Sequence, residues 1–146
     1  MKVIRATADD LAQLSELFDL YRVFYQQTSN IAAAKDFLKD RFQNSDSIIF
    51  IAIASDGTGL GFTQLYPSFS SVSMLSTYIL NDLFVTSEAR KKGVGEALMK
   101  KAKHFAISRG GKGLTLETAI DNPAQKLYLR LGFKKESDVN HYTWEV

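Results

Sequence analysis

The sequence predicts one domain of the α/β class, more closely an α+β fold with a mixed sheet, and three observations support this. The 146 residues are 45% hydrophobic and 23% charged, the composition of an ordinary globular domain. Segments with helical periodicity and segments with strand character follow one another along the chain. No repeat, low-complexity tract or linker interrupts them, so we expect a single unit over residues 1–146.

The expected element order is β-α-α-β-β-β-α-β-α-β-β. In that order the segments are strand 2–5, helix 11–25, helix 31–42, strand 48–54, strand 60–66, strand 72–85, helix 94–109, strand 114–120, helix 123–131, a strand from 133 onward and a strand 142–146.

Capping and turn residues justify the elements of the first half. Thr7 with Asp10 three residues later is a capping signal, and apolar side chains recur at helical spacing after it. Asn30 can cap the second helix. The β-branched run 48–54 meets the turn residues 55–59, which predicts a hairpin.

Proline and glycine bound the elements of the second half. Pro67 should end the return strand of the hairpin, because proline lacks the N–H group that a sheet uses. Gly110 and Gly111 should end the long helix. Pro123 can occupy the first position of the last helix, and Gly132 can close it.

Composition excludes several functions. Cysteine is absent, so a disulfide framework, a thiol nucleophile and cysteine-ligated metals are ruled out. With only His104 and His141, neither a metal centre nor a Ser-His-Asp triad is expected. The polar start lacks the apolar segment of a signal peptide, and the longest apolar run, 48–54, is too short to span a bilayer. We therefore expect a cytoplasmic protein without a membrane partner.

The charge is unevenly distributed. The net charge of +2 is too small to indicate nucleic-acid binding. Residues 90–112 nevertheless hold eight basic residues and one acid, Glu96, for a net charge of +7, so the remainder carries −5. This pattern suggests an anionic ligand at one place and a cationic one elsewhere. The alternative is a solvated helix face that carries Lys100, Lys101 and Lys103.

Two glycines open the long helix directly after a polar loop. Gly93 and Gly95 allow the backbone to approach a ligand closely, and the free N–H groups of a helix start face an anion such as a phosphate. The basic run 90–92 adds positive charge at the same end. The P-loop string is missing, and Leu98 stands where a dinucleotide fingerprint needs a third glycine. An ordinary turn and a nucleotide site remain the alternatives.

Two motifs resemble those of the GNAT superfamily of N-acetyltransferases. The run 90–95, Arg-Lys-Lys-Gly-Val-Gly, is similar to motif A, Arg/Gln-x-x-Gly-x-Gly/Ala. The run 122–133, Asn-Pro-Ala-Gln-Lys-Leu-Tyr-Leu-Arg-Leu-Gly-Phe, is similar to motif B, in which an asparagine and an alanine precede the string Tyr-x-x-x-Gly-Phe. The run 80–85, Leu-Asn-Asp-Leu-Phe-Val, further resembles the branch of polyamine and histone-type acetyltransferases. The resemblance covers the whole expected element order.

The resemblance implies a fold whose central strands splay apart and hold acetyl-CoA in the gap. The pantetheine arm would pair with the backbone of the strand before motif A, and the pyrophosphate would lie on N–H groups of the loop and helix start. A backbone N–H near Leu83 or Phe84 would stabilise the oxyanion. The residues so implied in cofactor binding are Leu83, Phe84, Val85, Arg90, Lys91, Lys92, Gly93, Val94, Gly95, Glu96, Asn122 and Tyr128.

Tyr128 and Asp82 are the expected catalytic residues. A phenol stays protonated at neutral pH, so Tyr128 can donate a proton to the departing thiolate. Asn81 stands where related diamine acetyltransferases carry a glutamate, and an amide cannot accept a proton. Asp82, Glu117 or a water chain would then serve as the base, although strand alternation places Asp82 on the opposite face from Asn81.

The sequence thus predicts an acetyl-CoA-dependent N-acetyltransferase that transfers acetyl directly to a primary amine and needs no metal. The acceptor would be a small amine, a polyamine, an amino acid derivative or a protein lysine. The resemblance also implies a homodimer, and no nucleic-acid partner is expected. The helix pair 7–42 and the loop 66–71 would shape the acceptor pocket. A non-catalytic acyl-CoA-binding or regulatory module is the alternative, because Asn81 replaces the glutamate.

Overall fold

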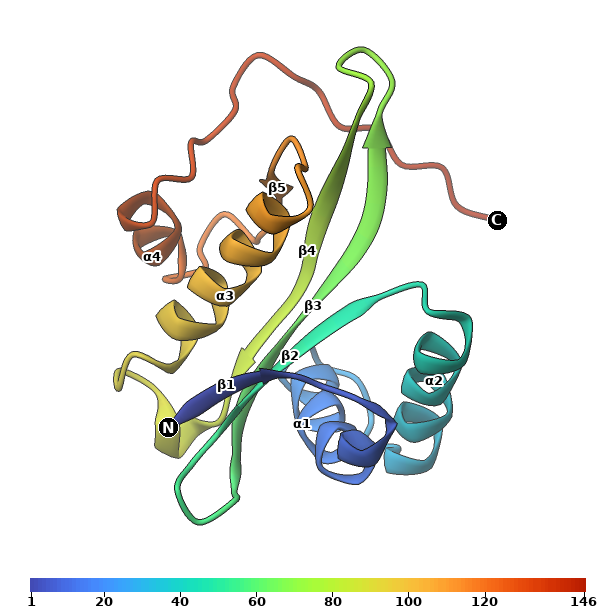
Figure 1. Cartoon of the computed structure of the whole chain (residues 1–146), viewed down its shortest axis with the longest axis vertical. Coiled ribbons are helices and arrows are strands. Elements are labelled where there is room, and N and C mark those ends of the chain that lie inside the picture. Colours follow the sequence, from blue (N-terminus) through green and yellow to red (C-terminus); the bar gives the residue numbers. More distant parts are fainter.

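A five-stranded sheet separates two layers of helices in the computed structural model, which describes all 146 residues (Figure 1). The strand order is β1-β2-β3-β4-β5, and every neighbouring pair is antiparallel except the parallel pair of β4 and β5. Helices α1 and α2 cover one face, and α3 and α4 lie on the other. The elements are β1 Lys2–Arg5, α1 Leu11–Phe24, α2 Ile31–Asn44, β2 Ile48–Ile53, β3 Gly59–Ser70, β4 Leu75–Val85, α3 Val94–Ser108, β5 Leu114–Thr115 and α4 Gln125–Arg130, with short 3₁₀ turns at Ala8–Asp10 and Ser87–Ala89.

The predicted fold class is confirmed, and the first half of the chain follows the sequence prediction closely. Thr7 and Asp10 form a capping box, in which the Thr7 N–H donates to the Asp10 carboxylate at 2.8 Å. The side chain of Asn30 accepts from the Ala33 N–H at 3.0 Å and so caps α2. These local signals succeed because each needs only residues a few positions apart. None of the helices is both long enough and apolar enough to cross a bilayer.

The prediction that Pro67 ends the return strand is wrong. Strand β3 continues to Ser70, and Pro67 pairs with Tyr78 of β4. Strand β2 accompanies β3 only as far as Leu65. Beyond that point β3 has an open edge, where the missing N–H of a proline removes no ladder hydrogen bond. The β3–β4 hairpin therefore projects beyond the rest of the sheet (Figure 1), and residues 66–70 are strand rather than loop.

The last third of the chain has less regular structure than predicted. Strand β5 has two residues instead of the expected run 114–120, and α4 begins at Gln125 rather than Pro123. The two terminal strands after Phe133 are not formed, because residues 134–146 have no regular secondary structure. The segment 134–138 is entirely polar and has no apolar face to bury against the sheet.

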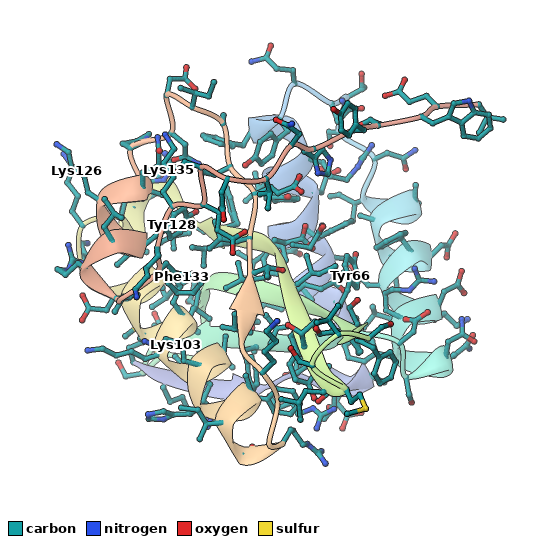
Figure 2. The ribbon with its side chains drawn as sticks, turned by 90° about the horizontal axis from the view of Figure 1, so that it is seen from above. Tyr66, Lys103, Lys126, Tyr128, Phe133 and Lys135 are labelled. Carbon is teal, nitrogen blue, oxygen red and sulfur yellow. The ribbon has the colours of Figure 1, made fainter.

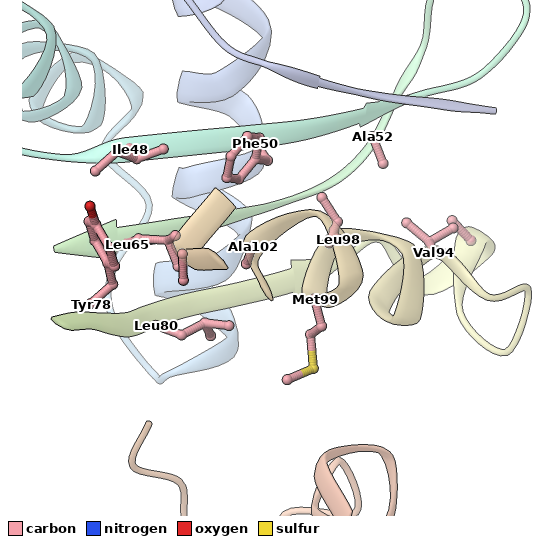
Figure 3. Packing of buried hydrophobic residues seen from close by; sticks show 12 residues of the cluster. Ile48, Phe50, Ala52, Leu65, Tyr78, Leu80, Val94, Leu98, Met99 and Ala102 are labelled. Carbon is pink, nitrogen blue, oxygen red and sulfur yellow. The ribbon is translucent and has the colours of Figure 1, made fainter. Parts of the chain in front are cut away.

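Two hydrophobic clusters flank the sheet, and β2 contributes to both because its side chains are buried on both faces. On the first side, apolar residues of α3 pack onto β2, β3 and β4 (Figure 3). The principal members are Ile48, Phe50, Ala52, Leu65, Tyr78, Leu80, Val94, Leu98, Met99 and Ala102. The second cluster joins α1 and α2 to the opposite face. The sheet is therefore held rigidly from both sides.

A bulge in β4 sets the direction of the side chains near its end. Leu80 pairs with Leu65 of β3 and Asp82 pairs with Gln64, so Asn81 has no partner in the ladder. The extra residue shifts the alternation of side chains. Leu80 belongs to the cluster beneath α3, whereas Phe84 belongs to the cluster beneath α1.

Candidate active site

Strands β4 and β5 separate soon after they meet. They pair only at Tyr78 with Leu114 and at Ile79 with Thr115. From Leu80 to Val85, β4 therefore has β3 on one side and no strand on the other. A cleft of about 300 Å³ occupies the gap. It is lined by the end of α1, the end of β4, the start of α3, the segment after β5 and the inner face of α4. This separation confirms the predicted splay of the central strands.

The open edge of β4 presents backbone to the cleft. Leu83, Phe84 and Val85 all line it. The Phe84 side chain is buried beneath α1, so its contribution to the cleft is its main chain. The Val85 carbonyl accepts from Arg90 Nε at 3.1 Å, and the Arg90 guanidinium lies 5.5 Å from the ring centre of Phe24. Arg90 thus ties the end of β4 to the end of α1.

The loop into α3 leaves a continuous row of backbone donors without acceptors. The N–H groups of residues 91–96 make no hydrogen bond within the protein. Lys91 has φ +60° and Gly93 has φ +79°, and such left-handed conformations turn successive N–H groups toward one side. The positive end of the α3 dipole lies at the same place. The loop can therefore bind an anion such as a pyrophosphate.

The side chains around this loop have separate roles. Gly95 lines the cleft, where a Cβ would meet Leu127 Cδ2 at 3.5 Å. The Glu96 carboxylate binds Lys100 Nζ at 2.7 Å and Arg130 at 3.0 Å. Hydrogen bonds from Lys100 and then Arg130 lower the pKa of Glu96. The Glu96 side chain therefore links α3 to α4, and only its N–H belongs to the row of donors.

Tyr128 lies on α4 across the cleft from β4. It is half-buried, and its ring centre is 6.2 Å from that of Phe133 (Figure 2). Burial raises the pKa of Tyr128, and a hydrogen bond with Thr118 opposes that rise. The phenol consequently keeps its proton at neutral pH.

Asn122 lines the same cleft and is held in one orientation. Its Oδ1 accepts from the Ala124 N–H at 2.9 Å. Its Nδ2 donates to Thr118 Oγ1 at 2.8 Å. Asn122 thus fixes the start of α4, as a cap does, and reaches the segment after β5 as well.

Asp82 lies away from the cleft. The bulge at Asn81 turns its side chain toward α1, where only 2% of the residue is exposed. Its carboxylate accepts from Gln64 Nε2 and, at 2.9 Å, from Asn81 Nδ2. Burial raises the pKa of Asp82, and hydrogen bonds from Gln64, Asn81 and Tyr21 partly offset this. The structure therefore does not bring Asp82 together with the other predicted site residues.

Two other polar residues singled out in the sequence do line the cleft, Asn81 and Glu117. The Glu117 carboxylate is largely exposed and lies 3.2 Å from Nδ1 of His141 in the C-terminal segment. No group of three or more histidine, aspartate and glutamate side chains is arranged to hold a metal ion.

The expectation that the helix pair 7–42 shapes the pocket holds for the end of α1, but sequence reasoning named none of its residues there and gave no role to Leu116 and Thr118 after β5. Phe24 and Tyr25 line the cleft and remain 55% and 47% exposed. The sequence does contain a signal for them, because the first helix has more apolar side chains than one buried helix face can accommodate. Leu116 and Thr118 also line the cleft, and no local pattern indicates that they do. The loop 66–71, expected to shape the pocket, contributes no lining residue.

Comparison with known proteins identifies the class. A model of the acetyltransferase (GNAT) family matches residues 14–133, and the chain belongs to this family. The chain is 46% identical, over all of its own length and 98% of the other, to an uncharacterized N-acetyltransferase, YhfO, of Bacillus subtilis strain 168. It is 32% identical to a probable acetyltransferase of Haemophilus influenzae over 82% of both chains.

A solved structure agrees with this assignment. The crystal structure of a probable acetyltransferase superposes with a TM-score of 0.95 at 37% identity, and the match covers 100% of this chain and 98% of the other. The protein is therefore an N-acetyltransferase, as the two motifs predicted. The polyamine and histone-type branch stays a prediction.

Proposed function

We propose that the protein transfers an acetyl group from acetyl-CoA directly to a primary amine. One observation carries the proposal: the unpaired edge of β4 and the row of free N–H groups at 91–96 meet in a single cleft. An extended arm with amide groups can add to such an edge as a strand does, and a pyrophosphate can accept the row of donors. Acetyl-CoA carries both features.

The cleft residues suggest how the transfer proceeds. The amine nitrogen attacks the thioester carbonyl carbon, and a backbone N–H near Leu83 or Phe84 stabilises the oxyanion. The carbon–sulfur bond then breaks, and Tyr128 gives its proton to the sulfur. Arg90 fixes the end of β4, and Asn122 fixes the start of α4. We therefore expect both residues to maintain the shape of the cleft as well as to bind acetyl-CoA.

The attacking amine must lose a proton to a base. Asp82 was the first expectation, but it lies behind Asn81 and outside the cleft. Glu117 lines the cleft and is exposed, so its position supports it better as the acceptor of that proton, either directly or through water. Asp82 would then act on the cleft only through the amide of Asn81.

The acceptor would be a small amine, a polyamine, an amino acid derivative or a protein lysine. The excess of acidic residues outside 90–112 supports a cationic acceptor. We further propose that the protein is a cytoplasmic homodimer that needs no metal and binds neither nucleic acid nor a membrane.

Thermal shift with four ligands tests the donor. Acetyl-CoA and coenzyme A should raise the melting temperature, whereas NAD and ATP should not, because a ligand that binds only the folded state stabilises it. Release of free thiol with a panel of amines then tests the transfer. A shift with NAD or ATP alone would contradict the proposed donor, and acetyl-CoA binding without thiol release would favour a binding module.

A further inference from the structure

The side chain of Asn81 lies on the wall of the cleft and is hydrogen-bonded from one side only. Asn81 is exposed and lines the cleft at the bulge of β4, whereas the neighbouring Asp82 is buried outside it. Asn81 Nδ2 donates to Asp82 Oδ1 at 2.9 Å. Asn81 Oδ1 accepts no hydrogen bond within the protein. The amide therefore has an unused acceptor at the cleft.

The carboxylate of Asp82 fixes the orientation of this amide. Each of its oxygens accepts from an amide NH₂ group, Oδ1 from Asn81 and Oδ2 from Gln64 Nε2, which is the pattern of an ionised carboxylate. Such a carboxylate has only acceptors, so the carbonyl oxygen of Asn81 cannot face it. Thr63 Oγ1 also donates to the main-chain carbonyl of Asp82 at 2.8 Å and holds this part of β4 in place. Asn81 Oδ1 is therefore kept on the side of the cleft.

The charge of Asp82 has no cationic partner in the protein. No lysine, arginine or histidine forms an ion pair with its buried carboxylate. A buried charge without a partner is costly. A hydrogen bond to a carboxylate also polarises the donating amide, which makes the Asn81 carbonyl oxygen a stronger acceptor. A cationic N–H donor at Asn81 Oδ1 would bind favourably and partly neutralise the buried charge.

We propose that Asn81 Oδ1 accepts a hydrogen bond from the nitrogen of the acceptor amine, and that Asp82 is a positioning residue that holds and polarises the Asn81 amide. The inference rests on the proposed transfer to an amine, and it names the group that selects a cationic primary amine. Asn81 takes up no proton, so the base is a separate group. The ammonium gives one proton to that base, keeps the N–H that Asn81 holds, and forms the new carbon–nitrogen bond with its lone pair.

Kinetics of Asn81→Leu test the binding role, with butylamine, putrescine, lysine amide and a lysine peptide as probes. Leucine keeps the size of the side chain and removes the acceptor, so KM of the best of these amines should rise about 10- to 100-fold, the usual effect of one hydrogen bond to a charged group. Affinity for acetyl-CoA, measured by calorimetry, should stay the same. Asn44→Leu, the same replacement at an exposed position of α2 outside the cleft, is the matched control and should leave KM unchanged.

A second variant covers the case in which Asn81→Leu does not fold. Asn81→Ala leaves room for a water molecule to hydrogen-bond to Asp82, and it should raise KM of the amine in the same way. A thermal shift with acetyl-CoA confirms that each variant is folded.

A quaternary analogue separates a hydrogen bond from a general effect on the cleft. The trimethylammonium analogue of the best amine keeps the positive charge but has no N–H to donate. Its inhibition constant should therefore change much less than KM of the amine in Asn81→Leu. Equal changes in the two constants would refute the hydrogen bond.

Asp82→Asn tests the positioning role, because it keeps the shape and removes the charge. KM of the amine should rise, but by less than in Asn81→Leu. In an Asn81→Leu background the same substitution should raise KM no further, because Asp82 acts through the missing amide. An unchanged KM in Asp82→Asn would refute the role of Asp82.

The wild type separates this inference from the proposed function. If it releases no thiol with any amine, the proposed transfer is wrong. If it releases thiol and Asn81→Leu has the KM of the wild type, the transfer stands and the role of Asn81 is refuted.

Discussion

Replacing Gly61 by alanine tests how closely β3 approaches the strand that borders the cleft. Gly61 pairs with Val85, and a Cβ at Gly61 would lie 2.3 Å from the Phe84 carbonyl oxygen and 3.0 Å from Val85 Cα. Ordinary contacts between carbon and oxygen are about 3.3–3.6 Å, so the two strands would have to separate by about 1 Å. The neighbouring hydrogen bond from the Thr86 N–H to the Leu60 carbonyl, 3.0 Å long, would then weaken.

The free energy of unfolding should fall by about 1–3 kcal/mol in Gly61→Ala. Overpacking costs about 1–3 kcal/mol and a weakened hydrogen bond about 1 kcal/mol, while alanine restricts the unfolded chain and offsets about 0.4–1 kcal/mol. Urea unfolding followed by circular dichroism measures the difference. Affinity for acetyl-CoA should fall as well, because Phe84 and Val85 line the cleft.

Gly95→Ala is the matched control on the other side of Val85. A Cβ there would lie 3.5 Å from Leu127 Cδ2 and 3.7 Å from Val85 Cγ2, which are ordinary contacts. Alanine also favours the helical conformation of α3, so stability should stay the same or rise by up to about 1 kcal/mol. Equal stability of Gly61→Ala and the wild type would refute the close approach of the two strands.

Three further predictions concern the acid, the anion loop and the α1–α2 connection. Tyr128→Phe should lower kcat by about 10²–10⁴-fold with little change in acetyl-CoA affinity, and unchanged turnover would remove Tyr128 from the mechanism. Gly93→Val should leave the protein folded but abolish measurable acetyl-CoA binding by calorimetry, because valine disfavours φ +79° and the loop must reorient. The control is Gly110→Val, which introduces a similar strain at φ +63° at the far end of α3 and should bind acetyl-CoA normally. Asp19→Asn should lower stability by about 1–3 kcal/mol at pH 7, because the buried Asp19 carboxylate accepts from Ser29 Oγ at 2.6 Å and from the Asn30 N–H at 2.7 Å. The Ser29 hydrogen bond is the main cause that lowers the pKa of Asp19. The stabilisation is therefore present above the unfolded pKa of about 3.9 and is lost as the pH falls through the lower, folded pKa. A deficit that grew as the pH was lowered from 7 would contradict the reasoning.

The sequence predicted those features whose physical cause is local. The capping box at Thr7, the Asn30 cap and the glycine-opened start of α3 each depend on residues a few positions apart, and all three are present. The two motifs also predicted the family, and they directed attention to the loop before α3 and to α4, both of which border the cleft. These signals are readable because the backbone conformation and the residue type constrain each other directly.

Features that depend on pairing between distant segments could not be predicted. Pro67 is tolerated in β3 because β2 stops at Leu65, which no local pattern near the proline indicates. The bulge at Asn81 arises from the register of β3 against β4, and it directs Asp82 away from the cleft.

Hydrogen exchange of the backbone amides with and without acetyl-CoA tests the central claim most directly, because it reads the cleft itself. Acetyl-CoA should slow exchange at residues 91–96, whose N–H groups have no acceptor in the protein, and along 80–85 at the open edge of β4. The tip of the β3–β4 hairpin, residues 71–74, should exchange as before. Binding of acetyl-CoA without protection at 91–96 and 80–85 would contradict the account.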